Sequence, residues 1–89
     1  MYTKTATILN QVGLHARPAT FLIQKANEFK CTIWIEKDER RVNAKSLLGV
    51  LSLGVAKDAQ INIIAEGADE VEAVETLFEL ISSDFADIE

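Results

Sequence analysis

The sequence contains few residues of the kinds that build covalent or metal centres. Its 89 residues include one cysteine, Cys31, one histidine, His15, and one proline, Pro18. A single cysteine excludes an internal disulfide and any metal site made only of cysteines, and it is typical of a reducing compartment. A single histidine leaves no pair of imidazoles to share a metal ion. We therefore expect neither a metal nor a cofactor.

Long apolar segments are also missing. No stretch approaches the roughly 20 apolar residues that cross a membrane, and residues 1–5 lack the apolar core of a signal peptide. We expect a cytoplasmic protein without membrane insertion. Repeats and linkers are absent too, and 48% of the residues are hydrophobic, which is enough for one core. Residues 1–89 are expected to form a single domain.

Basic residues are absent from the C-terminal third of the chain. Residues 1–57 carry all nine Lys and Arg residues and four acids, a net charge of +5, whereas residues 58–89 carry ten acids and no base, a net charge of −10. The acidic total argues against nucleic acid as a direct partner. The basic first part could present a positive face to an acidic protein. The simpler alternative is that the last helix has an acidic, solvated face.

The hydrophobic pattern predicts alternating strands and helices in the order β-α-β-β-α-β-α. The strands are expected at residues 2–8, 31–37, 40–43 and 60–66, and the helices at residues 16–27, 46–54 and 69–84. The two middle strands are separated by a two-residue turn and predict a hairpin. We therefore expect an α+β domain with its helices on one face of a mainly antiparallel sheet.

The first two helices leave apolar side chains that one buried face cannot hold. In the first helix, Phe21 projects away from the apolar face, which suggests a docking surface, although single exposed apolar residues are common. In the second helix, Val50 and Leu53 form one apolar face. Three leucines form another, roughly opposite; they are Leu47, Leu48 and Leu51. Because a short chain offers little to cover both faces, we expect the three leucines to be exposed and to mark a protein–protein site.

The last helix has a simpler pattern. Its buried face is predicted to consist of Val71, Val74, Leu77, Phe78 and Ile81, with glutamates on the opposite face. Asp69 and Glu72 have the spacing of a capping box, with Asp in place of Ser or Thr.

The strongest candidate for chemistry is the segment of residues 13–19, which reads GLHARPA. The neutral imidazole of His15 has a nitrogen lone pair that can accept a phosphoryl group near pH 7. It precedes a helix whose first N–H groups and positive dipole end favour an anion. Arg17 is close enough in sequence to bond phosphate oxygens, and Pro18 is compatible with the first turn. The alternative is a surface histidine without a function.

Ser46 is the second candidate. Its ordinary interpretation is the N-cap of the second helix. A regulatory phosphate on its hydroxyl would add about −1.5 to −2 charges beside the leucines, and could repel an acidic partner. Neither a Gly-rich phosphate loop nor a His/Cys metal cluster accompanies these residues. Any phosphate carried by this chain should therefore come from, and pass to, other proteins.

Two motifs carry a resemblance to a known family. Residues 13–19, together with residues 45–55, which read KSLLGVLSLGV, resemble HPr, the histidine-containing phosphocarrier of the bacterial phosphoenolpyruvate:sugar phosphotransferase system. Residues 66–70 fit as well, and the resemblance covers essentially the whole chain. It implies an HPr-like open-faced sandwich, in which a four-stranded antiparallel sheet of order 1-4-2-3 is covered on one face by three helices.

The resemblance also implies a function and its partners. His15 would accept a phosphoryl group on its pros nitrogen from enzyme I and pass it to IIA domains of sugar permeases, while Arg17 would stabilise the phosphate. The protein would be a carrier with a covalent intermediate and not an enzyme. Ser46 would be phosphorylated by HPr kinase/phosphorylase and would then act with the catabolite control protein in carbon catabolite repression. The chain would be a monomer, and partners would dock on Thr20, Phe21, Leu47, Leu48 and Leu51.

Two other functions remain open at this point. One is a regulatory interaction module that uses the leucines and Ser46 and never carries phosphate. A regulatory relative of HPr lacks the active histidine, so the presence of His15 favours a carrier. The other is a small-ligand-binding α+β domain, which would require a closed apolar pocket.

Overall fold

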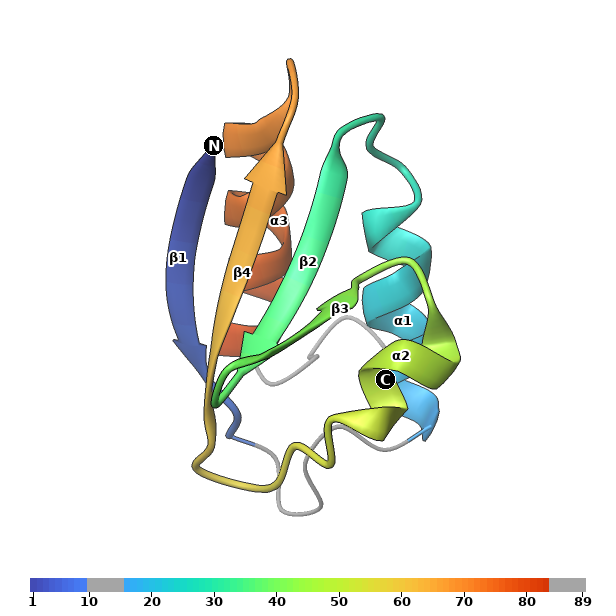
Figure 1. Ribbon diagram of the computed structural model, residues 1–89, viewed down its shortest axis with the longest axis vertical. Helices are drawn as coiled ribbons and strands as arrows, with labels where there is room; N and C mark the ends of the chain where they lie inside the picture. Colours follow the sequence, from blue (N-terminus) through green and yellow to red (C-terminus); the bar gives the residue numbers. More distant parts are fainter. Residues whose placement is uncertain (10–15, 84–89) are drawn as a thin grey trace.

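The computed structural model describes residues 1–9 and 16–83. Its elements follow the predicted order (Figure 1). The strands are β1 (Tyr2–Thr7), β2 (Thr32–Lys37), β3 (Arg40–Asn43) and β4 (Gln60–Glu66), and the helices are α1 (Ala16–Ala26), α2 (Leu47–Ser52) and α3 (Glu70–Ser82).

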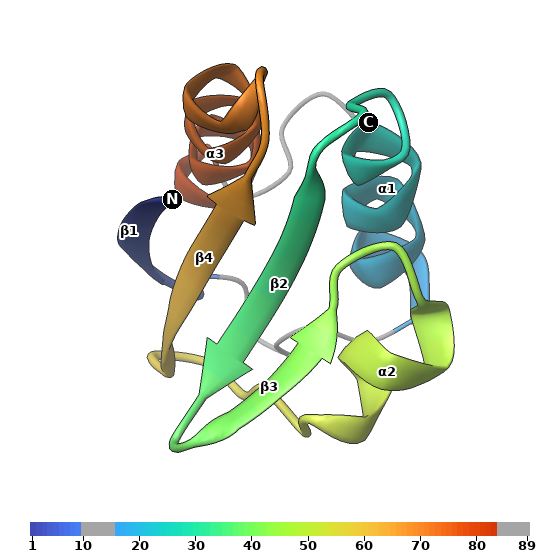
Figure 2. The same cartoon turned by 45° about the horizontal axis from the view of Figure 1, so that its top comes forward.

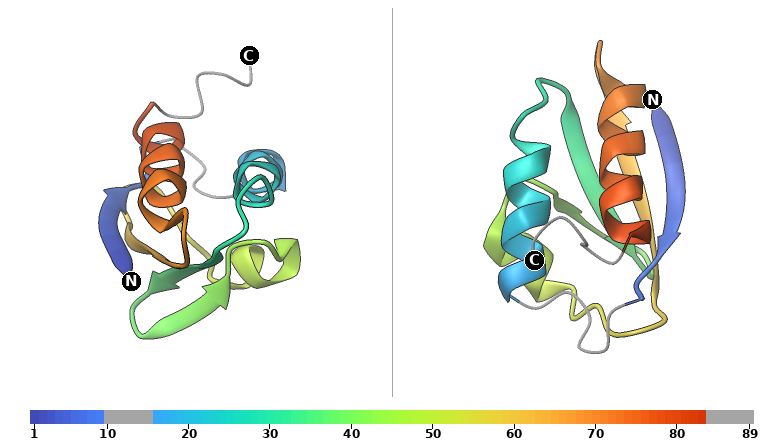
Figure 3. Two further views of the ribbon diagram at one scale, coloured as in Figure 1. Left: turned by 90° about the horizontal axis from the view of Figure 1, so that it is seen from above. Right: turned by 180° about the vertical axis from the view of Figure 1, so that it is seen from behind.

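The four strands form one antiparallel sheet in the order β1-β4-β2-β3. The three helices lie on the same side of this sheet, as Figures 2 and 3 show. Both findings confirm the predicted α+β architecture and strand order. The helices pack on the sheet because alternate strand residues are apolar on that side.

Side chains from β2 and β4 form the centre of the core. Ile33 and Ile35 of β2 and Ile61 and Ile63 of β4 are all at most 1% exposed, which confirms the alternation seen in the sequence. The alternation places Ile64 on the uncovered face, so its burial is not expected. It is nevertheless only 4% exposed. In the register it lies between Thr3 on β1 and Trp34 on β2, whose side chains share its face.

A row of polar side chains crosses the uncovered face beside Ile64. Thr5 donates to Asn62 at 2.7 Å, Asn62 donates to Glu36 at 3.1 Å, and Glu36 forms an ion pair with Arg41 at 3.5 Å. The Arg41 guanidinium lies 5.4 Å from the centre of the Trp34 ring. This row links all four strands, so the uncovered face is polar and cross-linked.

The buried face of α3 differs from the predicted one. Val71 is 51% exposed and Phe78 is half-buried, whereas Ala73 and Leu80 are buried together with Val74, Leu77 and Ile81. At 100° per residue, Val71 lies roughly 120° from the centre of this face. The prediction was wrong at Val71 because the buried face is turned toward Ala73 and Leu80, two residues that the prediction left out.

The predicted capping box at the start of α3 is also wrong. Asp69 makes no side-chain bond to its own helix. Its carboxylate accepts hydrogen bonds from the backbone N–H groups of Lys30 at 2.9 Å and Cys31 at 3.0 Å. Glu70 instead accepts the N–H of Gly67 at 3.1 Å and pairs with the N-terminal amine of Met1 at 3.0 Å. The bonds from Lys30 and Cys31 lower the pKa of Asp69.

Residues 29–31, the last part of the connection between α1 and β2, have two further contacts, with Lys45 and with Gly67. The Lys45 ammonium donates to the carbonyl oxygens of Phe29 at 2.7 Å and Cys31 at 3.0 Å. A Cβ added at Gly67 would come within 2.7 Å of the Cβ of Cys31. Gly67 also has φ +150°, a conformation that L side chains rarely adopt. The sequences before α2 and before α3 are therefore both fixed to this connection.

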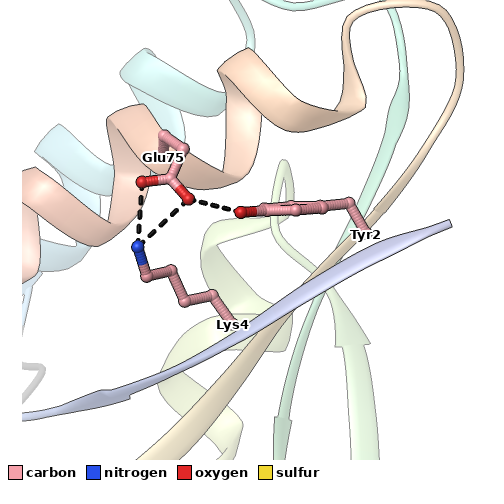
Figure 4. A network of polar contacts seen from close by, with 3 residues as sticks. All are labelled: Tyr2, Lys4 and Glu75. Carbon is pink, nitrogen blue, oxygen red and sulfur yellow. Dashed lines mark hydrogen bonds and ion pairs between the residues drawn. The ribbon is translucent and has the colours of Figure 1, made fainter.

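Strand β1 is attached to α3 by a polar cluster (Figure 4). Tyr2 donates its hydroxyl to Glu75 at 2.6 Å, and Lys4 donates to both oxygens of the same carboxylate at 2.9 and 3.1 Å. The Lys4 ammonium also lies 4.2 Å from the centre of the Phe78 ring. The hydrogen bonds to Glu75 raise the pKa of Tyr2 and Lys4, and those from Tyr2 and Lys4 lower the pKa of Glu75.

The contacts of Asp69 predict a defined pH dependence of stability. Since the folded pKa of Asp69 is lowered, its contribution is complete above the unfolded pKa, about 3.9, and is lost as the pH falls through the folded pKa. We expect Asp69→Asn to unfold at a lower urea concentration than the wild type at pH 7, and the difference to shrink below pH 4. Glu72→Gln, which removes a charge from the exposed side of the same helix, is the control. A difference that stays constant down to pH 2.5 would contradict the assignment.

Candidate functional site at the starts of α1 and α2

The first residues of α1 contain the described part of the predicted phosphate site. His15 lies outside the described residues. Arg17 is exposed, and Pro18 is buried in the first turn of the helix, where a missing N–H breaks no helical hydrogen bond. Thr20 and Phe21 follow in the next turn and are half-buried. Phe21 is therefore less exposed than its helical projection suggested.

Helix α1 packs against α2. The N-terminal turns of α1 lie beside α2 in both the front and the rear views (Figures 1 and 3). The structure thus brings the N-terminal turns of α1, which contain Arg17, Thr20 and Phe21, beside the helix of the second motif, which is about 30 residues further along the chain.

Ser46 is the N-cap of α2, as predicted. It has extended backbone angles, φ −112° and ψ 115°, and its Oγ accepts a hydrogen bond from the N–H of Gly49 at 3.2 Å. Gly49 is closely packed, because an added Cβ would lie 3.3 Å from this Oγ and 3.4 Å from the Cβ of Val42. Ser46 itself is half-buried.

Helix α2 buries one of its two apolar faces and exposes the other. Val50 is fully buried and Leu53 is 6% exposed, whereas Leu48 is 82% and Leu47 is 39% exposed. Leu51 is half-buried and packs against the core. The expected exposure is confirmed for Leu47 and Leu48 and is partial for Leu51. We refer to Leu47, Leu48 and Leu51 together as the leucine surface.

The C-terminal end of α2 has contacts that the sequence did not reveal. Arg40 donates to the carbonyl oxygen of Ser52 at 2.9 Å and to its hydroxyl at 3.4 Å, and Lys37 donates to the carbonyl oxygen of Gly54 at 3.3 Å. Gly54 has φ +61° and follows the helix end, as predicted. The two cations belong to the β2–β3 hairpin, and no local pattern near residue 52 points to them.

Cys31 does not add reactive chemistry. Its side chain is 4% exposed, and burial, followed by its hydrogen bond to Asp69, raises the pKa of the thiol to about 11. Because the thiolate is the nucleophile, this cysteine is unreactive near neutral pH.

A groove among the described residues bears on the alternative of a small-ligand-binding domain. A groove of about 600 Å³ lies between α1 and α3 and opens to solvent. Most of the side chains that line it are polar. The lining residues are Lys25, Thr76, Glu79, Leu80, Ser82 and Ser83. This is not the closed apolar pocket that a small-ligand domain would require. Within residues 1–9 and 16–83, no three His, Cys, Asp or Glu side chains are grouped as a metal site, and no helix is long and apolar enough to cross a membrane.

Comparisons with known proteins agree with the fold and the motifs. A family model described as the PTS HPr component phosphorylation site matches residues 2–83. The HPr-like protein Crh of Halalkalibacterium halodurans is 43% identical over 84 residues, which are 94% of this chain and 100% of the relative.

Solved structures show the same likeness. HPr-C-His from Thermoanaerobacter tengcongensis is 48% identical, with a TM-score of 0.93 over 96% of each chain. An HPr dimer from the same organism is also 48% identical, with a TM-score of 0.78 over 97% of this chain and 99% of that one. The sandwich predicted from the resemblance is therefore the observed fold, and this chain belongs to the HPr family of phosphotransferase-system phosphocarriers.

Proposed function

We propose that His15 accepts a phosphoryl group from enzyme I and donates it to IIA domains of sugar permeases in the cytoplasm. The observation that carries this proposal is that the N-terminal turns of α1, the helix that contains Arg17, lie beside α2, whose Leu47 and Leu48 are exposed. The helix proposed to present the phosphate and the helix proposed to dock partner proteins are thus neighbours. Membership of the HPr family supports the same function.

The proposed chemistry needs no other catalytic group from this chain. The lone pair of the neutral imidazole attacks phosphorus on the donor protein, the bond from phosphorus to the donor breaks, and its electron pair leaves with the donor. The reverse sequence on the acceptor protein regenerates neutral His15. Arg17 supplies charge-assisted hydrogen bonds to the phosphate oxygens, and the positive dipole end at the start of α1 favours the added negative charge.

Docking is assigned to the leucine surface together with Thr20 and Phe21. An exposed leucine gains from being covered by a partner, because burial removes its apolar surface from water. The positive charge of Arg17, at the start of α1, favours acidic partners. We propose that the protein carries out this exchange as a monomer. The HPr dimer from T. tengcongensis shows that a similar chain has been solved as a dimer.

Regulation is assigned to Ser46. Phosphorylation by HPr kinase/phosphorylase would place its charge beside the leucine surface, where it would repel an acidic partner and favour binding to the catabolite control protein. The N-cap position tolerates an anion, because the helix dipole is positive there.

A second candidate function is a purely regulatory module. Similarity to the HPr-like protein Crh favours it, and the leucine surface and Ser46 would serve it equally well. The presence of His15 distinguishes the two candidates chemically, since phosphohistidine is acid-labile and phosphoserine is acid-stable.

The first prediction from the proposed function concerns His15. Incubated with phosphoenolpyruvate and enzyme I, the wild type should take up about one acid-labile phosphate per chain, and His15→Ala should take up none. Arg17→Ala should slow the transfer roughly tenfold, because it removes charge-assisted hydrogen bonds to the phosphate. Absence of acid-labile phosphate on the wild type would refute the carrier function. Acid-stable phosphate formed with a serine kinase would then favour the regulatory module.

The second prediction concerns the leucine surface. Leu48→Ser should raise the KM of enzyme I for this protein roughly tenfold at unchanged kcat, because the partner no longer covers a leucine. The matched control is Val71→Ser, which removes an exposed apolar side chain from α3, on a helix outside the proposed docking region. Equal effects of the two substitutions would show that α2 is not the docking site.

The third prediction concerns charge at Ser46. Ser46→Asp should slow phosphoryl uptake from enzyme I, and added salt should reduce the effect because it screens the repulsion. Asp and Asn cap helices about as well as Ser, so Ser46→Asn is a neutral control that keeps α2 intact. If Ser46→Asn slows uptake as much as Ser46→Asp does, charge is not the cause.

A further inference from the structure

Helix α2 depends on contacts with the rest of the protein for its stability and orientation. It has only six residues, and helices of this length are unstable in isolation. Its core-facing residues, Val50 and Leu53, fix its depth in the domain. The direction in which the leucine surface points therefore depends on how the two ends of the helix are held.

The end opposite Ser46 is held by the two cations of the β2–β3 hairpin. Arg40 bonds both the carbonyl oxygen and the hydroxyl of Ser52, and that hydroxyl in turn donates to the carbonyl oxygen of Gly49 at 2.6 Å. Lys37 bonds the carbonyl oxygen of Gly54. The last carbonyls of a helix lack partners within it and carry partial negative charge, so cations stabilise this end.

The hairpin places these cations in an arrangement that is unfavourable without α2. Lys37 and Arg40 are direct partners in the register and extend to the same face, where two like charges repel each other. Between them, Asp38 has φ 55° and Glu39 has φ 89°. Positive φ angles suit Gly or Asn better than these acids. The repulsion and the strained turn are offset where both cations meet the negative end of α2.

From these contacts we propose that Arg40 is a positioning residue for docking, with Lys37 as its partner. It acts through Ser52 by holding the C-terminal end of α2, which sets the orientation of Leu47, Leu48 and Leu51 toward partner proteins. This inference rests on the proposed function, since it assigns a second group of residues to the same docking site.

The test compares Arg40→Ala with Arg41→Ala. Both remove one positive charge from β3, but Arg41 is directed to the uncovered face, where it pairs with Glu36. In phosphoryl uptake from enzyme I, Arg40→Ala should raise KM by roughly two- to fivefold at unchanged kcat, the range set by a cation at a helix end. Arg41→Ala should leave both parameters unchanged. Hydrogen exchange on the free proteins should show faster exchange of the α2 amides, including that of Gly49, in Arg40→Ala alone.

Each outcome decides the inference. Faster α2 exchange together with a raised KM in Arg40→Ala alone supports it. An equal rise in KM for the two variants overturns it, because charge alone is then responsible, and an unchanged KM in Arg40→Ala overturns it because docking then does not need Arg40. A raised KM with unchanged α2 exchange also overturns it, because Arg40 then contacts the partner directly. If wild type takes up no phosphate, the proposed carrier function fails, and the exchange data alone decide whether Arg40 holds α2.

Discussion

The three-dimensional arrangement depends on how residues 29–31 are held between two oppositely charged side chains. Asp69 accepts two backbone N–H groups of this connection, and Lys45 donates to two of its carbonyls. One charge comes from the residue before α3 and the other from the residue before Ser46. A single short connection thus joins the end of α1 to the starts of α2 and α3. Removing either charge would take a hydrogen bond from the part-buried backbone of Cys31, where an unpaired polar group is costly.

Periodicity in the sequence was sufficient to predict the elements and their layering. The alternation of Ile61 and Ile63 with polar residues predicted the face of β4 correctly, because strand periodicity depends only on near neighbours. The capping bond of Asp69 was misassigned because a local pattern cannot reveal partners far away in the sequence. Its spacing to Glu72 fits a local cap, yet its actual partners are 38 and 39 residues away. Val71 was misassigned because the apolar residues of α3 allow more than one choice of buried face, and packing selects the face that contains Ala73 and Leu80.

The candidate site was predictable to different degrees in its different parts. The two apolar faces of α2 were visible in the spacing of Val50 and Leu53 against the leucines, and exposure of Leu48 follows from packing on one side only. The contacts of Arg40 and Lys37 were not visible, because a turn that brings two cations together does not reveal which carbonyls they will meet. The physical chemistry of residues 13–19 permitted a phosphoryl acceptor without requiring it. The resemblance to HPr depended on the two motifs taken together, which no single local pattern supplies.

The environment of Cys31 has a practical consequence for probing the partners. A thiol that is 4% exposed and whose pKa is raised to about 11 reacts slowly with maleimides and similar reagents near pH 7. A second cysteine introduced on an exposed position, such as Gln60 at the start of β4, can therefore be labelled selectively in the otherwise unaltered chain. Replacing Cys31 beforehand is unnecessary, and would disturb the packing against Gly67. A single substitution is thus enough to attach one fluorophore or spin label.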